Sequence, residues 1–278
     1  NIIVSKSGNT LETIANTNFL INKNDKNIFI TGSENSYLRS LALKMKAEII
    51  NHNNFIGGRY SVLSEVGMLP ASLMGLNENK FKQLNNLIKN KNFINLLVSN
   101  IGSTLFFIKN KKFNSIILNY DNSSDELFNW YQQLIAESLG KKGKGIQPII
   151  STMPKDNHSL MQLYLDGPKN NFFTFFYAKE KNTSKIASSK ILKSHNYLKN
   201  KTLDEIKFSQ KMATENVFLK KNIPFRSFEV IDKNEESLGE LFCFFILETI
   251  LLGRALKVNP YDQPSVELIK TETKKILV

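Results

Sequence analysis

Short apolar runs alternate along the chain with longer segments in which apolar residues recur every three or four positions. Short apolar runs bounded by polar or turn residues are typical of buried strands, and the longer spacing is typical of amphipathic helices. The alternation of the two predicts βαβ units and therefore parallel sheets. The predicted strands are residues 1–4, 27–31, 48–51, 115–120, 147–151, 171–178 and 224–231.

The segments with helical spacing lie between these strands, and the polar segment 180–200 is predicted as loop with some helix. Gly140 follows one predicted helix and is a suitable C-cap. The predicted helices are residues 10–21, 36–46, 59–74, 77–90, 93–109, 123–139, 159–165, 202–220, 235–256 and 264–277.

This order of elements predicts an α/β protein with two lobes, residues 1–112 and 113–278. Each lobe is expected to be a parallel sheet flanked by helices in three layers. A ligand site is expected in the cleft between the lobes, at the carboxyl ends of the strands.

Composition agrees with a globular intracellular protein, since 41% of residues are apolar and 22% are charged. The most apolar stretch, 238–256, is interrupted by Glu240, Glu248 and Arg254. Its uninterrupted part is shorter than the roughly 20 residues that a membrane helix needs, so a core helix is predicted. The single cysteine, Cys243, excludes an intrachain disulfide and lies in an apolar run typical of a buried thiol.

The net charge of +12 raises the question of a nucleic-acid partner. Lysines are spread along the whole chain without a dense basic arm, so we predict no nucleic-acid partner. The excess positive charge favours encounters with anionic substrates such as sugar phosphates. The chain opens on a predicted strand without an initiator methionine, and we expect it to be a piece of a longer protein.

A serine-rich turn follows the first predicted strand and opens the first helix. A helix N-terminus offers unpaired backbone N–H groups, and Gly8 allows a tight turn around a phosphate. The alternative is an ordinary turn with a helix cap, which the turn alone does not exclude. A Walker loop and a GxGxxG motif are absent, so a phosphosugar is favoured over a nucleotide. The side chains available to a phosphate here are Ser5, Ser7, Asn9 and Thr10.

Four motifs in order give the chain a resemblance to the glucose-6-phosphate isomerase family, which is built of sugar isomerase (SIS) domains. Residues 5–13 resemble the SIS phosphate loop, and residues 57–61 match a Gly-Gly-Arg-Tyr-Ser signature. Residues 137–141, Glu-Ser-Leu-Gly-Lys, resemble the segment that holds the family's catalytic base. His158, Gly167 and residues 259–270 follow in the family's order, so the resemblance covers nearly the whole chain.

The resemblance implies reversible isomerisation of glucose 6-phosphate and fructose 6-phosphate through a cis-enediolate. It implies Glu137 as the base that moves the proton and Arg59 as the cation that stabilises the enediolate. His158 and Lys270 are implied to open the sugar ring, with His158 supplied across the interface of a homodimer. No cofactor and no metal are implied, and a cytoplasmic location is expected. The implied substrate contacts are Ser5, Lys6, Ser7, Asn9, Thr10, Thr13, Gly58, Gln133 and Gln263.

The sequence departs from the family at three places. Asn9 stands where many members have Thr or Gly, and Ser265 replaces a usual Gly. The family's N-terminal region, which completes the first lobe, is not in this chain. Two alternatives stay open: a non-catalytic SIS-type sensor of a phosphosugar, and an isomerase that also accepts mannose 6-phosphate.

Overall fold

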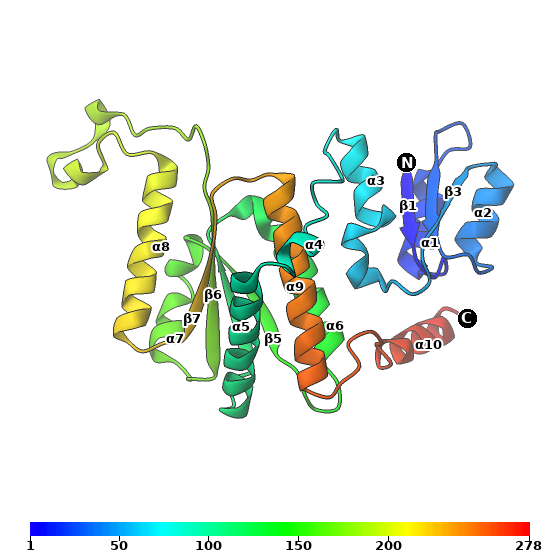
Figure 1. Cartoon of the computed structure of the whole chain (residues 1–278). Coiled ribbons are helices and arrows are strands. Elements are labelled where there is room, and N and C mark those ends of the chain that lie inside the picture. The colour runs from blue at the N-terminus through cyan, green and yellow to red at the C-terminus, as the bar shows by residue number, and fades with distance from the viewer.

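The computed structural model describes residues 1–278, apart from the side chain of Glu267. It contains two parallel sheets with helices around them (Figure 1), which confirms the predicted α/β fold. The strand orders are β1-β2-β3 and β5-β4-β6-β7. The strands are β1 (Ile2–Ser5), β2 (Ile28–Thr31), β3 (Glu48–Asn51), β4 (Asn114–Asn119), β5 (Gln147–Thr152), β6 (Asn171–Ala178) and β7 (Phe225–Val230).

The helices follow the predicted order, with several shorter than expected. The α-helices are α1 (Leu11–Leu20), α2 (Tyr37–Met45), α3 (Glu65–Leu73), α4 (Leu84–Leu87), α5 (Lys91–Lys109), α6 (Asp125–Leu139), α7 (Met161–Asp166), α8 (Leu203–Lys220), α9 (Glu235–Ala255) and α10 (Val266–Leu277). The 3-10 helices are η1 (Gly58–Leu63), η2 (Asn122–Ser124), η3 (Lys155–Asn157), η4 (Ser188–Lys190) and η5 (Lys193–Leu198).

The first sheet has its own small core. Ile3 and Phe29 are paired across β1 and β2, and both side chains are buried. They pack with Leu38 and Ala42 of α2 and with Ile14 of α1. Figure 1 shows α3, α6 and α9 between this sheet and the second one.

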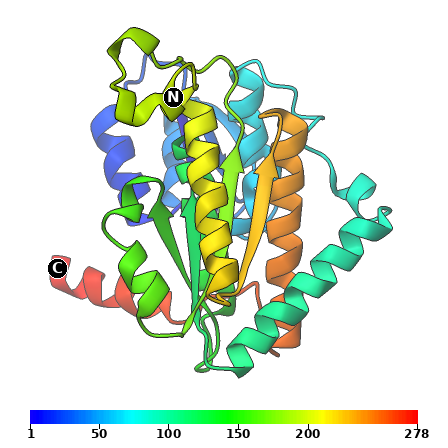
Figure 2. The ribbon, with the colours of Figure 1, turned by 90° about the vertical axis from the view of Figure 1, so that its left-hand side faces the viewer.

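Helices cover both faces of the second sheet. Successive side chains of a strand point to opposite faces, so apolar residues at neighbouring positions need a core on each side. In β4, Ile117 belongs to the core that α5, α6 and α9 build on one face. Its neighbours Ile116 and Leu118 belong to the core on the other face, together with Tyr164 of α7 and Phe218 of α8. Figure 2 shows α8 lying across the near face of this sheet.

Two predicted helices between the sheets are wrong. The segment 59–74 divides into η1 and α3, because the Ser64 side chain accepts the Val66 N–H and starts a new helix. In the segment 77–90 only α4 is α-helical. There the Asn77 N–H bonds the Glu235 carboxylate, and the Phe81 backbone lies against Gly239, where a Cβ would come within 2.4 Å of the Phe81 carbonyl oxygen. Contacts with α9 therefore override the local helical pattern.

The lobe division at residue 112 remains a prediction. The helix α5 lies before that division, yet Leu97 and Ile101 of α5 pack in the core of the second sheet. The polar segment 180–200 forms η4 and η5 and otherwise irregular backbone. Cys243 is buried in α9, and burial raises the pKa of its thiol.

A buried ion pair lies between the second sheet and its helices. The Glu248 carboxylate on α9 is 1% exposed and accepts hydrogen bonds from Arg226, Tyr131 and Asn100. Burial works against the charge of Arg226, but the Glu248 carboxylate more than compensates, so the pKa of Arg226 lies above its usual range. Burial and the same carboxylate raise the pKa of Tyr131.

Within the described part of the chain, no helix combines the length and the apolar character that crossing a membrane requires.

Candidate active site

The buried side chain of Arg59 connects three distant segments of the chain. Arg59 lies in η1, between β3 and α3, and is 3% exposed. Its Nε donates to Ser138 Oγ at 2.8 Å, and its Nη1 donates to Glu137 Oε2 at 3.1 Å. Nη1 also donates to Gln263 Oε1 at 2.6 Å. The predicted association of Arg59, Glu137 and Gln263 is therefore present.

All five N–H groups of this guanidinium find acceptors. Nη2 donates to the carbonyl oxygens of Pro260 at 2.7 Å and Asp262 at 3.0 Å. An arginine carries five donors in a fixed fork, so Arg59 has no donor left over. Arg59 is thus both the cation of the site and the anchor of the segment that leads to α10.

Glu137 lies in the last turn of α6 with its carboxylate half open to solvent. One oxygen faces Arg59, and the other accepts from Gln133 Nε2 at 3.0 Å, one helical turn earlier. Its side chain is 31% exposed. The carboxylate is therefore held on one side and accessible on the other, as a group that exchanges protons with a bound molecule must be.

Three side chains that the sequence did not single out fix Arg59 against α6. Trp130 Nε1 donates to the Arg59 carbonyl oxygen at 2.9 Å. The Tyr60 hydroxyl bonds Ser138 Oγ at 2.9 Å and donates to the Pro260 carbonyl oxygen at 3.1 Å. Burial raises the pKa of Tyr60, and its bond to Ser138 and the nearby Arg59 offset only part of that effect. Tyr60 and Ser138 stand beside predicted residues in the quoted motifs, which was the available signal.

A lysine at the end of α6 holds the segment that follows α9. Lys141 Nζ lies 2.7 Å from Asp262 Oδ1 and also donates to the Asn259 carbonyl oxygen. This contact is the main reason why the pKa of Asp262 lies below its usual range. Gly140 is the C-cap of α6, as predicted, with its N–H bonded to the Ala136 carbonyl oxygen.

Residues 5–10, at the end of β1, form a compact turn that is called the serine turn below. Ser5 Oγ and Thr10 Oγ1 are 2.8 Å apart, and Asn9 Oδ1 accepts from the Tyr37 N–H at 3.0 Å. Thr10 is the N-cap of α1, but its side chain makes no capping bond to that helix. Lys6 and Ser7 are exposed. The hydroxyls of Ser5 and Thr10 and the first N–H groups of α1 thus remain grouped at one helix N-terminus.

Glycine is required at the centre of this turn. Gly8 has φ of +62°, and a Cβ there would lie 2.0 Å from Ser36 Oγ and 2.9 Å from Thr31 Oγ1. The Thr31 hydroxyl is buried and has no hydrogen-bond partner among the described residues. A Cβ at Gly58 would meet no atom within 4 Å, so the backbone beside Arg59 borders open space.

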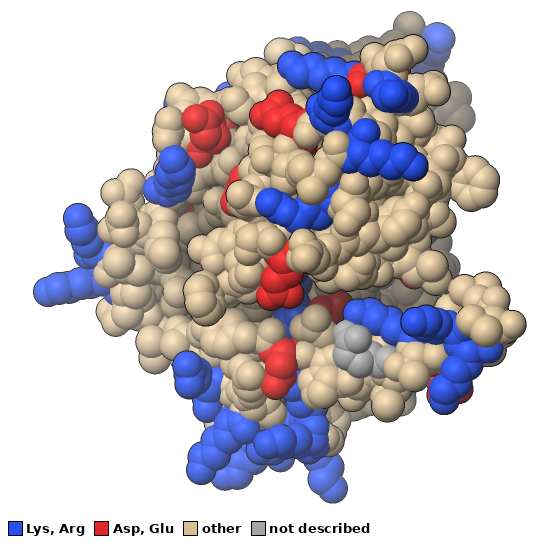
Figure 3. Space-filling view, turned by 90° about the vertical axis from the view of Figure 1, so that its right-hand side faces the viewer, with Lys and Arg blue, Asp and Glu red and all other residues tan. Residues whose placement is uncertain are grey.

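The candidate residues of the serine turn lie at the carboxyl edge of a sheet, as expected, whereas Glu137 does not. The serine turn follows β1 and lies at the carboxyl edge of the first sheet. The helix α6 runs back from the carboxyl end of β4, so Glu137 lies at the amino edge of the second sheet, near the start of β5 (Figure 1). Seen from the side of the first lobe, the surface is hollowed, and lysine and arginine side chains gather along its lower edge (Figure 3).

His158 lies elsewhere. It is exposed and follows the carboxyl end of β5, so the length of this strand, six residues or roughly 20 Å, separates it from the edge that carries Glu137. Its turn is held by Asp156, which accepts from Ser151 Oγ, the Thr152 N–H and Ser159 Oγ. Burial raises the pKa of Asp156, but these hydrogen bonds outweigh it, so the pKa lies below the usual range.

Lys270 and Gln263 do not share a helix. Gln263 precedes α10, which begins at Val266, and Lys270 lies within α10. The seven-residue spacing is therefore not two helical turns, and Gln263 owes its place to Arg59. Thr13 lies in the first turn of α1, next to the serine turn.

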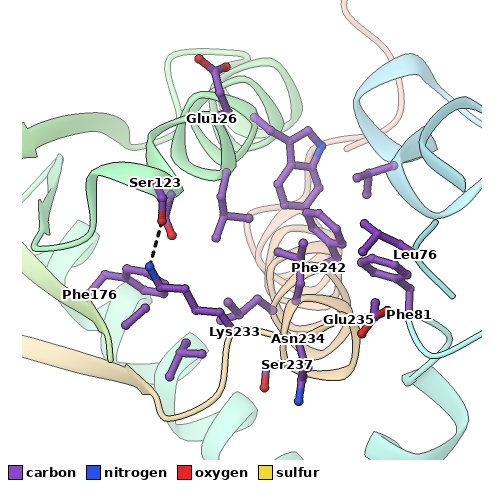
Figure 4. Close-up of a pocket in the computed structure, with 18 residues that line it drawn as sticks. Leu76, Phe81, Ser123, Glu126, Phe176, Lys233, Asn234, Glu235, Ser237 and Phe242 are labelled. Carbon is purple, nitrogen blue, oxygen red and sulfur yellow. Dashed lines mark hydrogen bonds between the residues drawn. The ribbon is translucent and has the colours of Figure 1, made fainter. Parts of the chain in front are cut away.

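A cavity of about 640 Å³ lies beside the carboxyl ends of β4, β6 and β7 and borders this cluster at Trp130. In Figure 4, Lys233 points across it to Ser123, to which its ammonium donates at 2.9 Å. The wall is mostly apolar and includes Trp130 and Phe242. Among the side chains that the structure describes, no group of three or more His, Cys, Asp or Glu residues is placed to bind a metal ion.

Comparison with known proteins gives a consistent answer. A family model described as phosphoglucose isomerase matches residues 1–278. The glucose-6-phosphate isomerase of Methanocaldococcus jannaschii is 32% identical, over 99% of this chain and 69% of that protein. That of Mycoplasmopsis pulmonis is 33% identical, over 99% of this chain and 68% of that protein. A solved hypothetical protein from Thermus thermophilus shares the fold, with a TM-score of 0.90 at 24% identity over 100% of this chain and 71% of that one.

The family match over the whole chain, together with two parallel sheets flanked by helices, places the protein in the class of phosphosugar isomerases. Within this class, the chain belongs to the phosphoglucose isomerase family, a family of enzymes.

Proposed function

We propose that this chain interconverts glucose 6-phosphate and fructose 6-phosphate by acid–base catalysis through a cis-enediolate. The contact between the Glu137 carboxylate and the buried Arg59 guanidinium carries this proposal. It joins a half-exposed base and a permanent cation, the two groups that an aldose–ketose isomerisation needs next to one carbon atom.

In the proposed reaction, Glu137 removes the proton from C2 of the open-chain aldose. The electrons of the broken C–H bond form the C1–C2 double bond, and the carbonyl oxygen at C1 takes the negative charge. Glu137 then returns the proton to C1, while the proton of the C2 hydroxyl passes to the O1 oxyanion, so that O2 becomes the ketone oxygen and O1 becomes the hydroxyl of the ketose. The open face of the Glu137 carboxylate is the face available for this transfer.

The geometry of Arg59 suggests which of its nitrogens faces the enediolate. Nε and Nη2 donate to Ser138 and to two backbone carbonyl groups, whereas Nη1 donates only to the side chains of Glu137 and Gln263. Side chains reorient more readily than backbone. We therefore infer that Glu137 and Gln263 yield the Nη1 donors to the substrate, while the bonds from Nε and Nη2 keep the cation in place.

The serine turn is the proposed phosphate site. The hydroxyls of Ser5 and Thr10, the unpaired N–H groups at the start of α1 and the exposed Lys6 and Ser7 all suit a phosphate group. Asn9 and Thr13 complete the proposed set, with Gly58 and Gln133 near the sugar. The unpartnered Thr31 hydroxyl beneath Gly8 adds a further polar group to this turn.

A coupled assay with fructose 6-phosphate tests the function and the phosphate site together. We expect turnover by the unmodified enzyme. Replacing both Ser5 and Thr10 with alanine should raise KM at least about tenfold, because hydrogen bonds to a charged group are lost and neither hydroxyl is left unpaired. Ser40→Ala, on the exposed face of α2, is the control and should leave KM unchanged. Absence of turnover by the unmodified enzyme would favour the sensor alternative.

We propose that the chain forms a homodimer in which His158 acts in the active site of the partner subunit. There, His158 and Lys270 together open the sugar ring. The distance between His158 and Glu137 along β5 argues against both acting in one site of the same chain. An exposed imidazole suits proton transfer near neutral pH, and the bonds to Asp156 hold its turn rigid.

Subunit mixing tests this arrangement. Glu137→Gln and His158→Gln are each expected to be nearly inactive alone. After subunit exchange, a hybrid dimer has one site with both substitutions and one site with neither, so activity should reappear. If exchanged hybrids form and stay inactive, the two residues act within the same subunit.

A non-catalytic sensor needs only the phosphate turn, so the Arg59–Glu137 contact favours the enzyme. Acceptance of mannose 6-phosphate is a second proposal for the same site, since that sugar differs only in configuration at C2.

A further inference from the structure

The buried histidine at the end of β3 bonds two parts of the chain at once. His52 directly follows β3, and its side chain is 1% exposed. Its Nδ1 contacts Glu65 Oε1, and its Nε2 lies 3.0 Å from the carbonyl oxygen of Ile56. Ile56 precedes η1, and Glu65 opens α3, so the imidazole closes the segment that carries Arg59.

These contacts require a specific number of protons. A backbone carbonyl oxygen only accepts, so Nε2 must carry a hydrogen. The contact between Nδ1 and the Glu65 carboxylate requires a second proton between the two groups. If that proton leaves, a lone pair of the imidazole faces a lone pair of an oxygen atom, either on Glu65 or on Ile56. That contact becomes repulsive, and the segment between Ile56 and Glu65 is held less firmly.

The segment between Ile56 and Glu65, which carries Arg59, needs this restraint. Gly57 and Gly58 precede Arg59, and glycines leave the backbone free to rotate. On the side of α6, Trp130 Nε1 donates to the Arg59 carbonyl oxygen at 2.9 Å. On the side of β3, the His52 imidazole restrains the same segment through Ile56 and Glu65.

We propose that His52 and Glu65, through the proton they share, are positioning residues that hold Arg59 against Glu137. Glu65 is the charged side chain bonded to the imidazole. Arg39 on α2 directs its guanidinium to the Gly32 carbonyl oxygen and to Asn51, and the side chain of Lys6 is exposed.

Tryptophan fluorescence reads this position directly. Trp130 is the single tryptophan of the chain, and its indole N–H is bonded to Arg59, so its emission follows the Arg59 backbone. We expect His52→Gln to shift the emission maximum of the folded chain, because the segment that carries Arg59 loses its restraint. His195→Gln, at an exposed histidine, should leave the emission unchanged.

Kinetics supplies the second readout. Glu65→Gln keeps the size of a side chain that is 28% exposed and removes the charge that retains the proton. We expect both His52→Gln and Glu65→Gln to lower kcat by up to about 10²-fold, the order of loss that a 1 Å misplacement causes, with little change in KM. His195→Gln should match the unmodified enzyme.

Fluorescence does not depend on catalysis, so it separates this inference from the function proposed above. Emission that is unchanged in both His52→Gln and Glu65→Gln would overturn the inference. So would a loss of activity that appears only as a higher KM.

Discussion

Replacing Glu137 with glutamine is expected to lower kcat by about 10³- to 10⁴-fold, the upper range for losing a general base. Glutamine keeps an oxygen that can accept from Arg59 Nη1, so the site should stay assembled while the group that accepts the proton is lost. Exchange of the substrate's C2 proton with deuterated solvent, followed by NMR, measures the lost step without the coupling enzymes.

Glu126→Gln is the matched control, because Glu126 is an exposed carboxylate in the first turn of the same helix. It should exchange at the unmodified rate. Affinity for a sugar-phosphate inhibitor should be similar in all three proteins, since the proposed phosphate turn is untouched. Exchange by Glu137→Gln at the unmodified rate would remove Glu137 from the mechanism.

Replacing Glu248 with alanine is expected to lower the free energy of unfolding by about 3–5 kcal/mol. The substitution leaves the guanidinium of Arg226, whose side chain is 21% exposed, without its counter-charge, although Thr174 Oγ1 and Asn100 Oδ1 still accept from it. The Tyr131 hydroxyl also loses the carboxylate to which it donates at 3.0 Å. Urea unfolding followed by circular dichroism measures the change.

Glu236→Ala on the same helix provides the comparison. Its carboxylate is 53% exposed and lies 3.9 Å from Lys80 Nζ, a surface pair worth at most about 1 kcal/mol. If both alanine substitutions cost the same, the buried pair contributes no more than the surface pair, and the core owes its stability to apolar packing alone.

The second sheet was predictable because its strands are buried on both faces. The predicted strand 171–178 has the bounds of β6, and its aromatic side chains divide between the two cores of the sheet. An apolar run interrupted only by Thr174 and flanked by polar residues leaves few alternatives to a central strand. The long helix predicted at 235–256 likewise ends within one residue of α9.

The segment between the sheets was less predictable, because its conformation depends on distant contacts. The apolar spacing in 77–90 suits a helix, but Gly239 of α9 leaves room for the Phe81 backbone, and Glu235 binds the Asn77 N–H. Neither partner is visible in a local pattern. Local reasoning therefore failed where another helix supplied the hydrogen bonds.

The site was found through the motifs and not through spacing. Arg59 and Glu137 are 78 positions apart, and no periodicity connects them. The five acceptors around Arg59 include two backbone carbonyl groups, which leave no signature in a sequence. His52 carried no motif, and its importance appears only when Glu65 and Ile56 are seen on either side of it.

The serine turn and the Glu137 carboxylate belong to segments packed on separate sheets, so the gap between them depends on how the two sheets are placed. If the turn holds the phosphate and Glu137 is the base, as proposed, a sugar phosphate reaches the carboxylate only when its carbon chain spans that gap. A shorter phosphate ester, fixed at the same end, would leave its reactive carbon out of reach. Under this proposal, the spacing between the sheets would select substrates by their length.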